Sequence, residues 1–157
     1  MKTIQSLAVS AALAIGLAAS ASAATTDPEV IIYRFPGVLD DGGGSDAGVA
    51  TIFHCTNFSG ATETVRFVTR DFDTTLKSNM TYTLDHLATK SASTHNAQAY
   101  SENLFLITGI VRQGTTAIAA TSINIICTAE TVDASISVPV GLARRGIRFN
   151  PVPGSQE

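Results

Sequence analysis

Cys55 and Cys127 are the residues of this sequence whose side chains offer the best-defined chemistry. Each lies in a run of apolar and β-branched residues, and the period-two alternation of that run places the thiol on the inward face of an expected strand. The pair lacks the C-x-x-C spacing typical of thiolate metal clusters. We therefore expect one disulfide between them, which would persist in an oxidising compartment. Two free thiols, or a metal site that also uses His54, are the alternatives.

The three histidines are the next candidates for catalysis or metal binding. His54, His86 and His95 form no H-x-H or H-E-x-x-H pair that would place two imidazoles on one metal ion. His54 should face away from Cys55, packed or hydrogen-bonded on the second face of its strand. His86 is in register with an apolar strand face and is expected to be partly buried, whereas His95 falls in a polar stretch. Since a G-x-S-x-G nucleophile motif is also missing, the sequence predicts no catalytic residue, no metal ligand and no cofactor.

Two groups of charged residues have the composition of ion-binding sites. Asp40, Asp41 and Asp46 lie in a glycine-rich stretch that we expect to be an exposed loop, and carboxylates in such loops bind calcium. The stretch lacks the ligand spacing of an EF-hand, so a solvated loop is the favoured interpretation. Near the C-terminus, a second group is a candidate anion-binding cluster, because guanidinium groups bind carboxylate and phosphate in a planar, bidentate way. Its members are Arg144, Arg145 and Arg148, and a solvated strand end is the alternative.

Residues 1–23 have the three parts of a secretory signal peptide. Lys2 supplies the positive charge, residues 7–17 are apolar, and Ala21-Ser22-Ala23 places small residues before an expected cleavage site. The apolar run is shorter than the roughly 20 residues of a membrane anchor. We therefore expect a single exported domain at residues 24–157, periplasmic or secreted, with no stable membrane insertion after removal of the leader. The formal net charge of −3 makes nucleic acid an unfavourable partner.

The remaining sequence consists of short β-branched and aromatic runs separated by turn residues, without a long amphipathic helical pattern. Proline and glycine at 36 and 37, and the Gln113-Gly114 pair, are expected to end or turn strands. The expected strands are residues 30–35, 49–57, 64–70, 80–94, 104–111, 117–128 and 136–140.

This pattern predicts an antiparallel β-sandwich in which Cys55 and Cys127 join the two sheets. It resembles the immunoglobulin arrangement in strand count and cysteine separation, so the likeness extends to general architecture only. The sequence contains no tryptophan, and Ile125 takes the place of the tyrosine that precedes the second immunoglobulin cysteine by two residues.

Function follows less directly, because a fold class does not define an activity. The sequence favours a non-enzymatic exported module that binds an unknown protein or polysaccharide, or contributes to the cell envelope. A hydrolase with an Asp/His site assembled from distant residues is one alternative; its sign would be a histidine beside Asp71, Asp73 or Asp85. A self-assembling surface subunit that exchanges a strand near residues 24–35 is another.

Overall fold

The computed structural model describes residues 29–149, which form ten strands and contain no helix. The signal-peptide prediction and both boundaries of the expected domain lie outside these residues. In chain order the strands are β1 (Val30–Asp40), β2 (Val49–Asn57), β3 (Glu63–Arg70), β4 (Leu76–Leu84), β5 (Thr89–Ser93), β6 (Leu104–Phe105), β7 (Val111–Ala120), β8 (Ile125–Asp133), β9 (Gly141–Arg144) and β10 (Ile147–Arg148). No helix long and apolar enough to cross a membrane occurs in this part of the chain.

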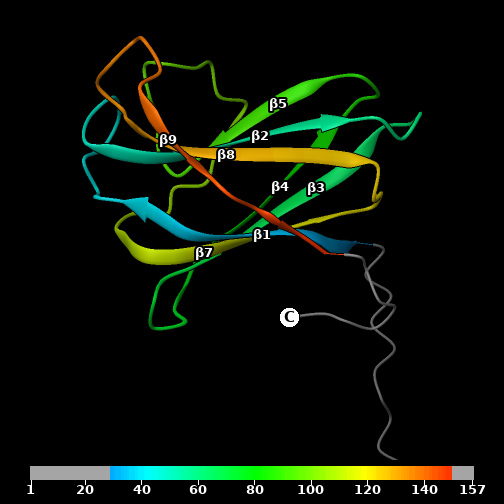
Figure 1. Cartoon of the computed structure of the whole chain (residues 1–157), viewed down its shortest axis with the longest axis horizontal. Helices are drawn as coiled ribbons and strands as arrows, with labels where there is room; N and C mark the ends of the chain where they lie inside the picture. The colour runs from blue at the N-terminus through cyan, green and yellow to red at the C-terminus, as the bar shows by residue number, and fades with distance from the viewer. Residues whose placement is uncertain (1–28, 150–157) are drawn as a thin grey trace, which may run out of the picture.

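The strands form two five-stranded sheets that pack face to face (Figure 1). Sheet A has the order β10-β1-β7-β3-β4, and sheet B has the order β6-β5-β2-β8-β9. All neighbours are antiparallel except β5 and β6, which are parallel. The predicted antiparallel β-sandwich is therefore confirmed, with one short parallel pair at an edge.

Aromatic side chains from both sheets meet in the core between them. Phe53 of sheet B contacts Phe35 of sheet A edge-on at 5.5 Å between ring centroids, and it contacts Phe67 of sheet A at 5.7 Å. All three rings are fully buried. Their burial removes apolar surface from water and adds ring-to-ring contacts, so this cluster holds the two layers together.

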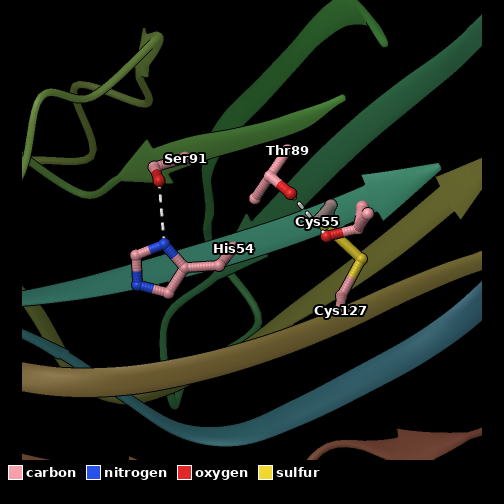
Figure 2. Close-up of a disulfide and its surroundings, with 6 residues drawn as sticks. His54, Cys55, Thr89, Ser91 and Cys127 are labelled. Atoms are coloured by element: carbon pink, nitrogen blue, oxygen red, sulfur yellow. Dashed lines mark hydrogen bonds between the residues drawn. A yellow bond between two sulfur atoms is a disulfide. The ribbon is translucent and has the colours of Figure 1, made fainter. Parts of the chain in front are cut away.

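The disulfide between Cys55 and Cys127 is present, but it does not join the two sheets (Figure 2). Both cysteines point into the core as expected, yet they lie directly opposite each other on β2 and β8, which are neighbours within sheet B. The inter-sheet prediction was wrong because alternation along a strand shows which face a residue occupies. It does not show which strand lies alongside.

Two expected strand breaks are also wrong. Strand β1 continues through Pro36 to Asp40, with a register shift between Pro36 and Val38, and a bulge tolerates a residue that cannot donate to the ladder. Gly114 lies inside β7 rather than in a turn. A Cβ atom there would stand 2.4 Å from the carbonyl oxygen of Arg70, so glycine is needed for close approach of the backbone.

Four expected strands have different bounds in the structure. The stretch 80–94 is divided between β4, which begins at Leu76, and β5. The stretch 117–128 is divided between β7 and β8, and Ile123 is exposed between them. Only Leu104–Phe105 of the stretch 104–111 pairs as a separate strand before β7 begins. Residues 136–140 form no strand, and the chain pairs again only at β9. Apolar composition alone does not mark strand ends, because pairing depends on a neighbour.

Strands β9 and β10 follow one another across the side of the sandwich. The orange-to-red segment in Figure 1 passes from β8 in sheet B toward β1 in sheet A. Gly146 lies at the crossing, where an added Cβ would stand 2.4 Å from the ring of Phe35. Because a larger residue does not fit against this ring, glycine lets the chain pass closely over the core.

Candidate functional site

A connected row of polar side chains lies on the outer face of sheet B. We call it the outer-face row, and its members are Ser91, His54, Glu130 and Tyr100. The Ser91 hydroxyl is 2.8 Å from Nδ1 of His54. Figure 2 shows this contact as a dashed line. On the other side of the imidazole, Nε2 is 3.5 Å from Oε1 of Glu130. The Tyr100 hydroxyl donates a hydrogen bond to the same carboxylate oxygen.

Strand register brings three members of the row together. Ser91 on β5 lies opposite His54 on β2, and Thr128 on β8 lies opposite His54 from the other side. Glu130 is two residues beyond Thr128 and therefore projects from the same face of β8. Side chains directly across from or diagonal to one another on a sheet face are within contact distance. The prediction that His54 is hydrogen-bonded on the second face of its strand is confirmed.

Tyr100 reaches the row from the loop that follows β5. This loop covers one end of the outer face of sheet B with a small second core of Ala50, Ile52, Ala97, Val132 and Ala134, against which Tyr100 packs. The Gln98 amide donates to the carbonyl of Ala134, which fixes the loop to the chain just after β8. The Tyr100 ring lies 4.7 Å from the His54 ring, centroid to centroid.

A pocket of about 340 Å³ opens beside the row. It is lined by His54, Tyr100, Thr128, Ala129, Glu130 and Ala143. Ala143 lies opposite Glu130 in the β8–β9 ladder, and a Cβ atom on Gly141 would stand 2.9 Å from Oε2 of Glu130. Small residues on β9 therefore leave room for the carboxylate and for the pocket. The volume is that of a site for a small molecule.

The charge of this site is carried by Glu130. The side chains of His54 and Glu130 are each 22% exposed, so both are partly shielded from water. The hydrogen bond to Glu130, followed by burial and the negative charge of that carboxylate, raises the pKa of Tyr100 to about 12. The tyrosine is therefore a neutral donor at physiological pH. In the described residues, the one basic side chain paired with Glu130 is His54.

A second polar cluster is formed by Asp40 and His95, and it corrects the expectation that residues 40–46 are a solvated loop. Asp40 ends β1 and is 1% exposed. Its carboxylate pairs with Nδ1 of His95 at 2.9 Å and accepts hydrogen bonds from the Thr108 hydroxyl and the Gly42 amide. Nε2 of His95 is 3.0 Å from the carbonyl of Ala47. The loop is thus fixed against the chain after β5.

The other acidic residues of the loop are also engaged in local contacts. Asp41 accepts a hydrogen bond from the Gly43 amide, and Asp46 accepts one from the Asn96 side chain. No group of three or more His, Cys, Asp or Glu side chains within residues 29–149 is arranged to hold a metal ion. Calcium binding by Asp40, Asp41 and Asp46 has no structural support here.

The three arginines predicted to form an anion-binding cluster make different contacts in the structure. Arg144 donates from Nε to the Thr131 hydroxyl at 2.8 Å. Arg148 donates to the carbonyl of Ile123 and lies over the ring of Tyr33 at 5.6 Å. Arg145 and Arg148 line a pocket of about 550 Å³ together with Pro36, Gly146 and Ile147. Anion binding by Arg144, Arg145 and Arg148 stays a prediction.

The remaining expected contacts of histidine and aspartate differ from the structure. His86 is exposed rather than partly buried, and its Nδ1 accepts a hydrogen bond from the Gly60 amide. The two paired histidines face Asp40 and Glu130, and not Asp71, Asp73 or Asp85.

Sequence reasoning missed Glu130, Tyr100 and Ser91. The available signal was a single carboxylate on the outer face of the otherwise mostly apolar and threonine-rich strand 125–132.

No protein family model, curated protein or solved structure matches the chain. The fold and the site define the class of protein: it is a disulfide-bonded β-sandwich with a small polar pocket on one outer face.

Proposed function

We propose that the protein is an exported, non-enzymatic interaction module that binds a protein partner through an exposed apolar segment, residues 136–142. The observation that carries this proposal is a short segment, before and within β9, in which four apolar residues at alternate chain positions are open to solvent. Ile136 is 40% exposed, Val138 64%, Val140 68% and Leu142 71%. Several exposed apolar residues within one short segment are typical of interaction sites, whereas single ones scattered over the surface are not.

The position of the segment supports this role. Strand β9 is an edge strand of sheet B and pairs only with β8 in the described part of the chain. An edge strand offers unpaired backbone groups to an extended partner, and alternate side chains then provide specificity. A protein partner can supply both the strand and the apolar contacts. Export is supported by the leader-like sequence of residues 1–23 and by the disulfide, which suits an oxidising compartment.

The segment is tested by replacing Val138 and Val140 with asparagine. The oxidised protein of residues 24–157 serves as bait against the producing cell's envelope and culture medium, with captured protein quantified by mass spectrometry. We expect the double variant to capture at least about tenfold less partner, a loss of about 1.4 kcal/mol in binding free energy. The matched control is Phe72→Asn with Leu76→Asn, an exposed apolar pair at the β3–β4 turn.

Equal capture by wild type and the Val138/Val140 variant would contradict the proposal, as would an equal loss in the control. Capture of polysaccharide instead of protein would also contradict it. Light scattering of the bait alone separates self-association from binding of another protein.

Strand exchange by residues 30–35 would have to break the pairing of β1 with β7, which runs from Val30 to Asp40.

A hydrolase is the second candidate, because Ser91, His54 and Glu130 form a serine–imidazole–carboxylate chain. In such a chain, Ser91 Oγ would attack an ester carbonyl while Nδ1 of His54 takes the hydroxyl proton, and Glu130 would stabilise the imidazolium. Two features disfavour this role. Ser91 is not among the residues that line the pocket, and Glu130 already accepts the Tyr100 hydroxyl.

Substitution of Ser91 by alanine decides between the two functions. Because we propose a non-enzymatic module, we expect wild type and Ser91→Ala to hydrolyse p-nitrophenyl acetate at the same rate and to resist labelling by a fluorophosphonate. The control is Ser137→Ala, which removes a serine hydroxyl from an exposed position. Labelling of wild type and Ser137→Ala, lost only in Ser91→Ala, would establish the hydrolase instead.

A further inference from the structure

A shielded carboxylate without a strong cationic partner points to a ligand at the outer-face pocket. The Glu130 side chain is 22% exposed, and its partners are the hydroxyl of Tyr100 and the imidazole of His54. No lysine or arginine is paired with it within residues 29–149. Removing a carboxylate from water costs free energy unless an opposite charge or sufficient hydrogen bonds compensate. A cation that enters the pocket would provide this compensation.

The two oxygens of the carboxylate have different surroundings. Oε1 accepts the Tyr100 hydroxyl and faces His54 Nε2. Oε2 lies beside Gly141, where an added Cβ atom would stand 2.9 Å from it. Nε2 of His54 is itself buried and makes no hydrogen bond, and it lies 3.5 Å from Oε1. The site thus has acceptor capacity at Glu130 that its own donors do not fill.

The walls of the pocket suit a small organic cation. The Tyr100 and His54 rings lie 4.7 Å apart and form one side, and aromatic faces attract cations. Ala129 and Ala143 contribute apolar surface, and Thr128 adds a hydroxyl acceptor. A neutral hydroxylated ligand would find the same hydrogen bonds but would not offset the charge of Glu130.

We propose that this pocket binds a primary alkylammonium group, with Glu130 as its counter-ion and the alkyl chain against the alanines and the Tyr100 ring. The group comes either from a free amine or from a lysine side chain of a peptide. An ammonium has three donors and a compact charge, which fits one free carboxylate oxygen and the Thr128 hydroxyl. This inference goes beyond protein binding through residues 136–142 and does not depend on it.

The test is a titration of the oxidised protein followed by backbone NMR, at constant ionic strength. The charged probes are propylammonium chloride and the blocked tripeptide acetyl-Gly-Lys-Gly-amide. Sodium chloride is the reference that lacks the alkyl group, and acetyl-Gly-norleucine-Gly-amide is the reference that lacks the charge. We expect saturable shifts confined to the pocket residues with at least one charged probe, and none with the references. Binding by propylammonium alone would identify a free amine, and binding by the tripeptide alone would identify a lysine side chain.

Three variants make the test specific. Glu130→Gln should weaken binding at least about tenfold, since the counter-ion is lost. Glu63→Gln is the matched control, because Glu63 also accepts a hydroxyl hydrogen bond, from Thr121, but on sheet A. Ala143→Leu fills the pocket from an exposed position of β9 and should abolish binding while Glu130 is kept.

Absence of saturable shifts with both charged probes would overturn the proposal. So would unchanged affinity in Glu130→Gln or Ala143→Leu, or an equal loss in Glu63→Gln. The Val138/Val140 double variant should bind the amine as wild type does, so failure of partner capture and failure of amine binding are distinguishable.

Discussion

The pairing of His95 with Asp40 requires the imidazole to be charged. Nδ1 faces the Asp40 carboxylate and Nε2 faces the carbonyl of Ala47, which can only accept. Both ring nitrogens therefore need a proton. The hydrogen bond to Asp40 accordingly raises the pKa of His95, although burial opposes this. Burial alone would raise the pKa of Asp40, but hydrogen bonds from His95 and neighbouring groups, together with the charge of His95, outweigh it and lower that pKa.

These two pKa shifts predict that the free energy of unfolding falls both at alkaline pH, through His95, and at acidic pH, through Asp40. Because the pKa of His95 is raised, protonated His95 stabilises the fold fully below its pKa in the unfolded state, about 6.5. This stabilisation is lost as pH rises through the pKa of the folded state. Because the pKa of Asp40 is lowered, ionised Asp40 stabilises the fold above its pKa in the unfolded state, about 3.9. This stabilisation is lost as pH falls through the pKa of the folded state. We expect His95→Gln to cost about 1.5–3 kcal/mol near pH 5 and clearly less at pH 9, measured by urea unfolding.

The control for this measurement is His86→Gln, because His86 is exposed and makes one hydrogen bond to a backbone amide. A cost for His95→Gln that stays constant between pH 5 and pH 9 would show that the pair does not depend on a charged imidazole.

At the scale of elements, β2 and β8 form the best-connected pair of sheet B. Their ladder runs without a register shift from Val49 opposite Asp133 to Asn57 opposite Ile125, and it places the disulfide and part of the outer-face row on the same two strands. Successive side chains on a strand point to opposite faces of the sheet, so Cys55 and Cys127 point inward while His54 and Thr128 point outward. The disulfide thus fixes the register on which the pocket depends.

Replacing both cysteines with alanine should lower the free energy of unfolding by about 2–4 kcal/mol and leave the fold intact. The bond closes a loop of 72 residues, but the rest of the ladder and the aromatic core remain. Urea unfolding of the oxidised protein and the variant measures the difference. The control is Thr56→Ala with Thr89→Ala, which removes a hydroxyl contact between β2 and β5. A double-cysteine variant as stable as wild type would show that the bond contributes nothing.

For the whole molecule, the two faces of sheet B have different environments. The inner face packs on sheet A, and the loop after β5 covers one end of the outer face through the small second core. The chain then passes from sheet B to sheet A through β9 and β10. This path leaves apolar side chains of residues 136–142 exposed. Strand β9 contributes Leu142 to this segment and Ala143 to the lining of the outer-face pocket. Both proposed binding surfaces therefore depend on where one edge strand lies.

The sequence by itself determined the all-β class, the disulfide partners and the faces of the residues around them. These properties follow from local alternation and from the presence of only two cysteines. Local patterns also placed His54 on the face opposite Cys55, where its partner Ser91 is found.

Only the tertiary structure decided which strands are neighbours, that the disulfide lies within one sheet, and that Asp40 is buried with His95. It also assembled Ser91, Glu130 and Tyr100 around His54. Hydrogen-bond register and loop packing join residues that are far apart in the chain, and the free energy of those contacts appears only when the partner is in place. No local pattern in a single sequence predicts these long-range contacts.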